Sequence, residues 1–330
     1  MAGRLNRRIL ASLSLFAPFL GLVFVYLFFG LYELVYVDGE SSFATLFSRY
    51  NLNIVAAQTT IVALAALGMT LVIISGGIDL SPGSSIALTT TVIAVWLRDD
   101  GSPIGALLLG TGCAAMVGFA NGALITGLRI VPFIVTLGMM GIARGAAKWL
   151  GDEQRVTAPE TWLNGLLAVD PSPDAPLWKV PFGVVLLVVF AGLVHCVLRY
   201  SVFGRHVFAI GSNESTARLC GVAVRRQKVL IYALAGALTG LAGVMQFSQL
   251  TVGDPTVAVG KELDVIASVV IGGGSLAGGR GSILGTIVGA LVMGILRNGC
   301  DIYGIPNYWQ EIFIGLIIIA AVGVDQLRRR

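Results

Sequence analysis

Long apolar blocks alternate with short polar connections along almost the whole chain. Ten of these blocks approach the length of about 20 residues that a helix needs to cross a bilayer. They cover residues 10–32, 54–75, 82–98, 104–128, 131–150, 180–198, 229–250, 262–274, 282–298 and 310–326. The pattern predicts an all-α protein, a polytopic membrane helix bundle of about ten transmembrane helices, within a range of nine to eleven.

Two glycine-rich runs interrupt this pattern beside apolar blocks. The block 262–274 is too short to cross the bilayer as an ordinary helix, so we expect broken or re-entrant segments, which need protein or water around their backbone. The candidates for gating or translocation in the two runs are Gly76, Gly77, Asp79, Ser81, Gly272, Gly273 and Ser275. Two interpretations of Asp79 stay open: it caps the helix that begins near Ser81, or it has a role in gating or coupling.

Composition and charge support membrane embedding. Hydrophobic residues make up 56% of the chain, charged residues 12%, and the mean hydropathy is +0.86, whereas soluble domains are roughly 25% charged. With the N-terminus inside, the cytoplasmic segments hold 14 of the 22 basic residues and 3 of the 18 acidic residues. Basic residues are retained in the cytoplasm during insertion, so we expect both termini there. The net charge of +4 then needs no nucleic-acid partner.

The two longest loops are the outer loop Gly151–Trp178 and the inner loop Arg199–Lys228. A chain below about 40 residues rarely supports its own core. The protein therefore carries no fused ATPase or substrate-binding domain in these loops, and another polypeptide must supply either activity.

The inner loop contains a pattern typical of a short capped helix, about eight residues long, between glycines. Ser212 or Asn213 can accept a hydrogen bond from an amide of the first turn, and Glu214 suits the positive end of the helix dipole. Gly221 supplies a left-handed stop. Such a short helix is unstable alone in water, so we expect it to pack against this protein or another. The alternative is a solvated connector.

Catalytic and metal chemistry find little support in the sequence. The run from Gly274 to Gly281 approaches a phosphate-binding loop, but Arg280 replaces its lysine and Gly281 its hydroxyl residue. The four cysteines lack metal-binding spacing. We expect no catalytic residue, no metal and no cofactor on this chain. A secondary transporter would show more buried acids or histidines than these helices offer.

Five segments together resemble the permeases of ribose, xylose and arabinose type ABC importers. The resemblance runs in the same order from about residue 50 to the C-terminus. The segments are 66–88 (ALGMTLVIISGGIDLSPGSSIAL), 131–145 (VPFIVTLGMMGIARG), 203–222 (FGRHVFAIGSNESTARLCGV), 232–244 (YALAGALTGLAGV) and 262–286 (ELDVIASVVIGGGSLAGGRGSILGT).

The resemblance implies that residues 1–330 form a single permease domain in the inner membrane, with 199–228 as its cytoplasmic coupling loop. The implied partners are two copies of an ATP-binding subunit or one fused tandem ATPase, a periplasmic sugar-binding protein and a second permease subunit. ATP and Mg would be bound by the ATPase partner. The residues implied in ATPase coupling are Gly204, Gly211, Asn213, Glu214, Ala217, Arg218 and Gly221.

Two other functions remain open on the sequence. One is the permease of a related ABC importer for another small solute, such as an amino acid or a nucleoside. The other is a secondary transporter, which would work with an ion gradient and without ATP. The identity of the sugar, and whether the dimer is homomeric or heteromeric, do not follow from the residues.

Overall fold

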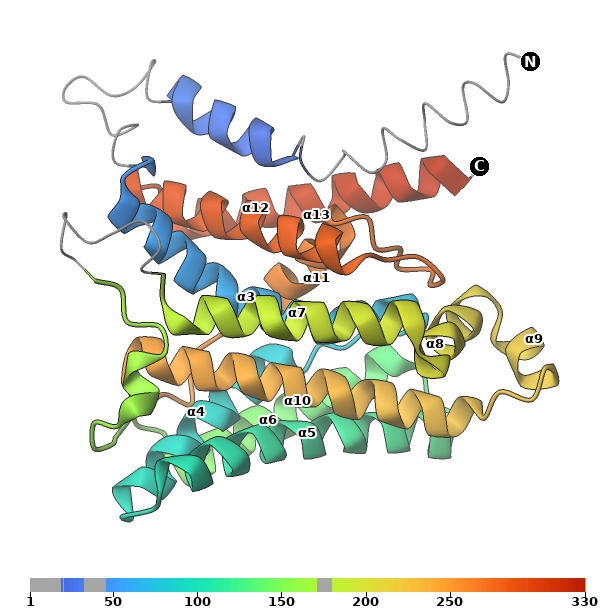
Figure 1. Cartoon of the computed structure of the whole chain (residues 1–330), viewed down its shortest axis with the longest axis horizontal. Coiled ribbons are helices and arrows are strands. Elements are labelled where there is room, and N and C mark those ends of the chain that lie inside the picture. The colour runs from blue at the N-terminus through green and yellow to red at the C-terminus, as the bar shows by residue number, and fades with distance from the viewer. Residues whose placement is uncertain (1–18, 20, 33–45, 171–179, 330) are drawn as a thin grey trace.

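The computed structural model describes residues 19, 21–32, 46–170 and 180–329, and it consists almost entirely of helices running roughly along one direction (Figure 1). An apolar helix, Gly21–Tyr32, precedes the labelled elements. The α-helices that follow are α3 (Arg49–Ile74), α4 (Pro82–Arg98), α5 (Pro103–Leu128), α6 (Pro132–Leu150), α7 (Phe182–Tyr200), α8 (Val202–Ser212), α9 (Glu214–Leu219), α10 (Val224–Leu250), α11 (Lys261–Ile271), α12 (Ile283–Ile302) and α13 (Asn307–Arg329).

The ends of these helices follow local sequence signals. Proline opens α4, α5 and α6, where its missing N–H costs nothing because first-turn amides have no partner within the helix. Ser48 and Ser102 accept hydrogen bonds from amides of the first turn of α3 and α5. These signals explain why the predicted spans 82–98, 104–128 and 131–150 match the observed helices within one residue.

The helix α3 forms the centre of the bundle. In its most apolar stretch 94% of the residues are buried, compared with 22% for α5, α6 and α7. Figure 1 shows α12 and α13 on one side of α3, and α4, α5, α6 and α10 on the other. The exposed apolar faces of α5, α6 and α7 are therefore the surfaces suited to lipid.

Small residues bring the long helices into backbone contact. A side chain at Gly236 of α10 would overlap Ala114 of α5, and one at Gly240 would lie 2.8 Å from the Cα of Thr111. This close packing is what small residues four positions apart allow in membrane helices. Gly236 and Gly240 therefore serve close packing of α10 against α5.

The number of helices that can span a membrane is partly settled. Among the described residues, six helices are long and apolar enough: α3, α5, α6, α7, α10 and α12. The helix α4 has 17 residues. Of the predicted first span, 10–32, the structure describes residue 19 and residues 21–32, and the remainder lies outside the described residues.

The predicted break at the end of the block 262–274 is confirmed. The helix α11 has 11 residues, about 16 Å of rise, which is about half of the hydrocarbon thickness. It ends at Ile271 instead of Gly274, and the irregular segment 272–282 leads to α12.

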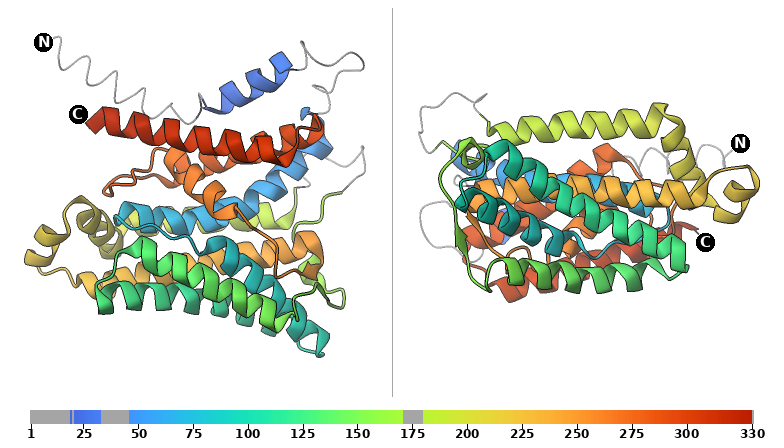
Figure 2. Two further views of the ribbon diagram at one scale, coloured as in Figure 1. Left: turned by 180° about the vertical axis from the view of Figure 1, so that it is seen from behind. Right: turned by 90° about the horizontal axis from the view of Figure 1, so that it is seen from below.

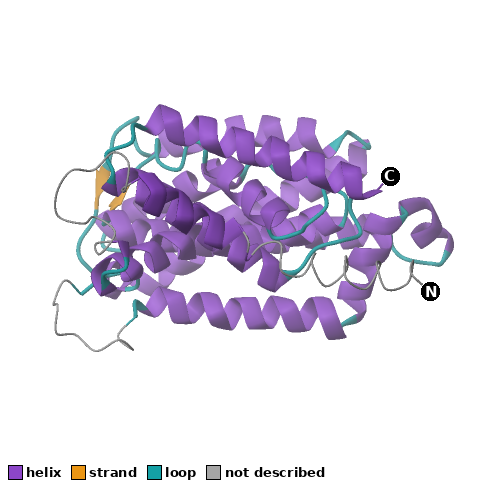
Figure 3. Cartoon of the chain, turned by 90° about the horizontal axis from the view of Figure 1, so that it is seen from above, coloured by secondary structure: helices purple, strands orange, loops and turns teal. Residues whose placement is uncertain are grey.

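One end of the bundle carries the irregular segments that follow α6 and α10. Here β1 (Val156–Thr157) pairs antiparallel with β2 (Val252–Gly253), and the 3-10 helix η1 (Trp162–Gly165) follows β1. Figure 3 shows the strands at the end opposite to the C-terminal end of α13. Figure 2 shows α8 and α9 projecting at the other end.

Candidate functional site

The helix α9 is a short element built by its caps. Asn213 adopts an extended conformation, and its Oδ1 accepts a hydrogen bond from the amide of Thr216 at 2.9 Å. Glu214 occupies the first turn, where the helix dipole favours an acid. Gly221 has φ +84°, the left-handed conformation that ends the helical path. Figure 1 shows α9 extending beyond the ends of the long helices.

The expected short capped helix between the glycines is confirmed as α9, but its length is 6 residues instead of about eight. The segment forms two helices: Gly211 and Ser212 belong to the end of α8, and α9 has 6 residues. The physical reason is that Asn213 closes α8 and caps α9 at once, so the chain turns at this residue. Its amide bonds to Ala209 O, behind it in α8, while its side chain faces α9.

The packing of α9 leaves one apolar side chain uncovered. Ala217 is buried in a small cluster with Ile210 of α8 and Val224 of α10. Leu219, by contrast, is 89% exposed.

Glu214 links α9 to α10. Its Oε2 accepts from Lys228 Nζ at 2.6 Å, and its Oε1 accepts from Arg218 Nη2 at 3.0 Å. The hydrogen bond from Lys228 is the largest influence on the pKa of Glu214, which lies below its ordinary value. The carboxylate therefore stays charged and holds α9 against the first turns of α10.

The start of α8 is fixed against the end of α7. Ser201 Oγ accepts from the amide of Gly204 at 3.0 Å, and a side chain at Gly204 would overlap the backbone of Leu198. Gly204 thus sets the tight angle between α7 and α8, which aims α8 toward the end of α3.

Gly211 stands where three segments meet. A side chain there would overlap Ile74 O at the end of α3 and lie 2.6 Å from the amide nitrogen of Gly279, and Gly279 N donates to Ile74 O at 2.8 Å. A side chain at Gly278 would in turn lie 3.0 Å from Gly76 Cα and 2.7 Å from Gly211 O. We call Ile74, Gly76, Gly211, Gly278 and Gly279 the glycine junction.

The glycine junction joins the two runs singled out in the sequence to the inner loop. Gly76 lies in the segment before α4, Gly278 and Gly279 lie in the segment between α11 and α12, and Gly211 lies in the last turn of α8. The end of α8 is therefore in direct backbone contact with both breaks.

The first break, residues 75–81, has four buried residues, Ser75, Gly77, Asp79 and Ser81, and is held by side chains from other helices. The carbonyl oxygen of Ile78 accepts from Thr136 Oγ1 of α6 and from the Tyr232 hydroxyl of α10, each at 3.4 Å. A side chain at Gly77 would overlap that hydroxyl. Non-helical backbone inside a bundle requires such partners.

Asp79 lies within this break and is 4% exposed. Its Oδ1 accepts from the amide of Ser81 at 2.8 Å and from Ser81 Oγ at 2.6 Å. Asn121 Nδ2 of α5 donates to Ser81 Oγ at 3.1 Å, while the Oδ1 atom of Asn121 has no partner among the described residues. Asp79 thus fixes the turn at the start of α4 through Ser81. The Oδ1 atom of Asn121 remains beside this turn as a buried hydrogen-bond acceptor.

The second break, residues 272–282, is held in place by contacts of its own backbone. A side chain at Gly272 would overlap Gly285 of α12, and Gly273 has φ +88°. The amide of buried Ser275 donates to Arg280 O at 3.1 Å, which folds residues 275–280 into a loop against the glycine junction.

A buried ion pair joins α11 to α12, and it does not follow from the sequence pattern. Asp264 of α11 is fully buried and accepts from Arg297 Nε at 2.7 Å and Nη2 at 2.9 Å. The charge distribution along the chain places Asp264 among the outer acids, without a partner. The signal available is an Asp in the first turn of one apolar block and an Arg in the next.

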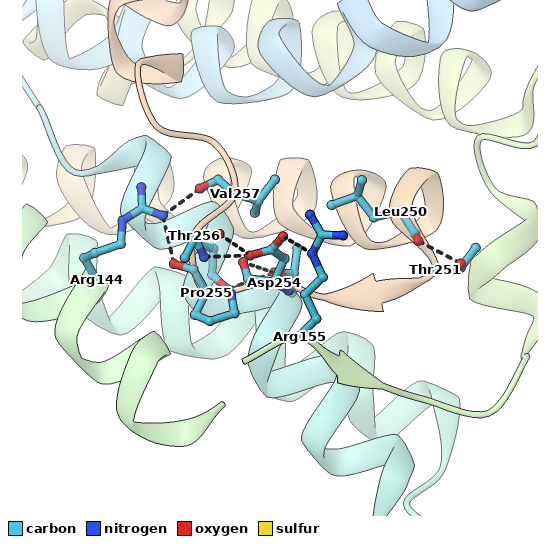
Figure 4. Close-up of polar contacts among 10 residues, drawn as sticks. Arg144, Arg155, Leu250, Thr251, Asp254, Pro255, Thr256 and Val257 are labelled. Atoms are coloured by element: carbon cyan, nitrogen blue, oxygen red, sulfur yellow. Dashed lines mark hydrogen bonds and ion pairs between the residues drawn. The ribbon is translucent and has the colours of Figure 1, made fainter. Parts of the chain in front are cut away.

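A second polar cluster lies between α6 and the segment after β2 (Figure 4). Arg155 Nε donates to Asp254 Oδ2 at 3.0 Å, and Arg144 Nη1 donates to the carbonyl oxygens of Pro255 and Val257. Burial raises the pKa of Asp254, but hydrogen bonds from Thr256 and Arg155 bring it below the ordinary value. The cluster fixes the irregular segment at the strand end of the bundle, and sequence reasoning gave none of its members a role.

The arrangement is suited to transmitting movement. The helix α9, which lies outside the bundle, is bonded to α10, and the glycine junction joins α8 to the two breaks. Among the described residues, no group of three or more His, Cys, Asp or Glu could hold a metal ion.

Comparison with known proteins gives extensive matches. A family model described as branched-chain amino acid transport system / permease component matches residues 51–322. The ribose import permease protein RbsC of Escherichia coli strain K12 is 37% identical over 86% of this chain and 88% of its own. The fructose import permease protein FrcC of Rhizobium meliloti is 33% identical over 86% and 80%. The L-arabinose ABC transporter permease protein AraH of Azospirillum brasilense is 35% identical over 82% and 78%. No solved structure matches the chain.

Proposed function

The chain belongs to the family described as branched-chain amino acid transport system / permease component, and from this premise we propose that it is the membrane-spanning permease subunit of an ABC importer for a monosaccharide. The observation that carries the proposal is the similarity to ribose, fructose and arabinose permeases over more than four fifths of the chain. The sugar would be ribose-like or a related one.

The proposed assembly places ATP and Mg on partner subunits. Two copies of an ATP-binding subunit, or one fused tandem ATPase, would bind α9 and the neighbouring end of α8. A periplasmic sugar-binding protein would deliver the sugar at the strand end of the bundle. A second permease subunit, identical or different, would complete the pathway.

The proposed location is the inner membrane, with α8, α9 and both termini in the cytoplasm. The concentration of basic residues in the segments at this end supports it. The C-terminal end of α13 also lies toward the end of the bundle that carries α8 and α9 (Figure 1).

The proposed mechanism follows the contacts. ATP binding moves the partner subunits, which displace α9 through surfaces such as exposed Leu219. The contact between Glu214 and Lys228, and the packing of Ala217 on Ile210 and Val224, pass this movement to α8 and α10. The glycine junction then shifts the breaks before α4 and after α11, which alternates access to the pathway.

A permease for another small solute is a second candidate, because the family description names branched-chain amino acids. It predicts the same coupling and a different cargo. The binding protein would set most of the specificity in either case.

The test is uptake into proteoliposomes that contain the chain, its ATPase and its binding protein. We expect ATP-dependent uptake of at least one of labelled ribose, fructose and arabinose, and no uptake with a non-hydrolysable ATP analogue. Uptake of labelled leucine instead would favour the second candidate.

A variant with residues 211–221 replaced by a flexible linker should insert into the membrane and lose uptake. Full uptake by this variant would overturn the coupling proposal. Uphill uptake by the chain alone, with only a proton or sodium gradient, would overturn the importer proposal in favour of a secondary transporter.

A further inference from the structure

A basic cavity lies beside α9 and shares Glu214, Arg218 and Lys228 with the contacts used in the proposed coupling. It has a volume of about 840 Å³ and opens between the α5 to α6 turn and the start of α10. Its charged lining consists of Arg129, Glu214, Arg218, Arg225, Arg226 and Lys228. Five positive groups thus face one negative group.

The single carboxylate of the cavity is already neutralised. Glu214 accepts from Lys228 and Arg218 at the cavity wall. Arg129, Arg225 and Arg226 are exposed, and no hydrogen bond or ion pair of their side chains is found within the described part of the chain. The guanidinium groups of these three arginines therefore line the cavity with N–H donors that have no partner in the described part of the chain.

The backbone adds to the positive potential of the cavity. The helix α10 has 27 residues and begins here at Val224, and its N-cap, Ala223, provides no side-chain acceptor. The N-terminus of a long helix carries partial positive charge and free amide donors, which favour an anion. Side chains and backbone thus select the same kind of ligand.

The surface beside the cavity is apolar and unpaired. Leu128 is 64% exposed, Val131 60% and Ile134 59%, and all three flank the lining residues of the α5 to α6 turn. A ligand with an anionic head and apolar chains matches both surfaces, whereas a soluble anion would use only the cavity.

We propose that this cavity binds the headgroup of an anionic phospholipid from the leaflet at the α9 end of the bundle. The lipid phosphate would contact Arg129, Arg225 and Arg226, and the acyl chains would lie along Leu128 and Ile134. Basic pockets at the cytoplasmic ends of membrane helices suit such headgroups. Bound lipid would also stand next to Arg218 and Lys228, the two partners of Glu214, and so stabilise α9.

The proposal depends on the membrane placement of the chain and goes beyond its transport role. Its test uses the full chain alone, in nanodiscs that contain phosphatidylcholine with increasing phosphatidylglycerol, and counts retained lipids by native mass spectrometry. We expect selective retention of phosphatidylglycerol. In the variant R129Q/R225Q/R226Q, retention should weaken on the order of a hundredfold, because each basic residue contributes roughly a factor of five.

Two further variants separate the cavity from general charge and from misfolding. R199Q/R205Q/R280Q removes three exposed arginines that do not line the cavity and should retain phosphatidylglycerol as the wild type does. R129K/R225K/R226K preserves charge and topology and should keep most of the retention.

Three results would overturn the proposal. One is an equal loss of retention in both glutamine variants, which would indicate bulk electrostatics. Another is displacement of the lipid by inorganic phosphate at equal concentration, which would indicate a soluble-anion site. The third is unchanged lipid retention in R129Q/R225Q/R226Q together with lost binding of the purified ATPase subunit, which would assign the cavity to an acidic protein surface.

Discussion

Glu214 is the residue that fastens α9 to the rest of the molecule. It is 41% exposed, so the energy of its ion pairs is screened by water, but its two oxygens reach different elements. Lys228 is only 17% exposed and belongs to α10. The ion pair between Glu214 and Lys228 therefore contributes by fixing the position of α9 relative to α10, and less by its energy.

The Glu214 contact should give α9 a specific pH dependence. The pKa of Glu214 is lower in the folded protein than its ordinary 4.5, so the contact stabilises α9 above about pH 4.5 and is lost as the pH falls through the lower folded value. Hydrogen exchange of residues 214–219 should be constant between roughly pH 5.5 and 8, after correction for intrinsic rates, and rise in more acidic buffer.

Two variants test this assignment. E214Q should show faster exchange in 214–219 at neutral pH and no acid-dependent step. E160Q, which alters an exposed glutamate on the segment after β1, should behave as the wild type. An acid-dependent step that persists in E214Q would show that another group is responsible.

Asp264 and Arg297 present the opposite case, a bidentate pair in which the carboxylate is fully buried. Removing one partner leaves an uncompensated charge in the bundle. R297M should therefore lower the free energy of unfolding by roughly 3 to 5 kcal/mol, measured by thermal unfolding in detergent.

The double variant D264L/R297M removes both charges and should recover most of that loss, because packed apolar side chains can replace a buried pair. R98M breaks an exposed pair with Asp99 and should change stability by less than about 1 kcal/mol. Equal losses in R297M and R98M would contradict the burial argument.

Among the elements, α8 has a placement that depends on the missing side chain of Gly211. Its last turn rests on Ile74 O and on the loop at Gly279, with no room for a β-carbon at Gly211. G211A should force α8 away from the glycine junction. Hydrogen exchange in residues 272–282 should then increase, and ATPase activity of the assembled importer should lose its response to the binding protein.

Gly192 of α7 provides a matched control. It is a helical glycine, and a β-carbon added there would have no neighbouring atom within 4 Å. G192A should therefore be neutral or stabilise the helix by up to about 1 kcal/mol. If G211A behaves like G192A in both measurements, the glycine junction does not link α8 to the breaks.

For the whole molecule, the sequence predicted those features whose causes are local. The helix α4 begins at Pro82 and ends at Arg98, as its apolar length and flanking polar residues indicated. The shortness of α11 was equally visible from its glycines. Even the separation of α8 from α9 had a signal, since Ser201 and Asn213 are both capping residues.

The features that escaped prediction join distant segments. The glycine junction unites Ile74, Gly211 and Gly279, and Asp264 meets an arginine 33 positions later. Glycine patterns report that two backbones approach closely, but one sequence does not say which ones. Likewise, a charged residue next to an apolar block is expected outside the membrane as long as its ion-pair partner within the bundle is unknown.

The orientation of the whole molecule can be measured with its own cysteines. Cys220 is exposed directly after α9, whereas Cys300 is buried. In the variant C113A/C196A/C300A, a membrane-impermeant maleimide should label Cys220 in inside-out vesicles and not in right-side-out vesicles. In a cysteine-free background, D152C, at the exposed end of α6, should show the reverse.

The two ends of the bundle must give opposite results, because the described long helices run between them (Figure 1). Labelling of Cys220 from outside would place α9 away from ATP and exclude it as a contact for a cytoplasmic ATPase.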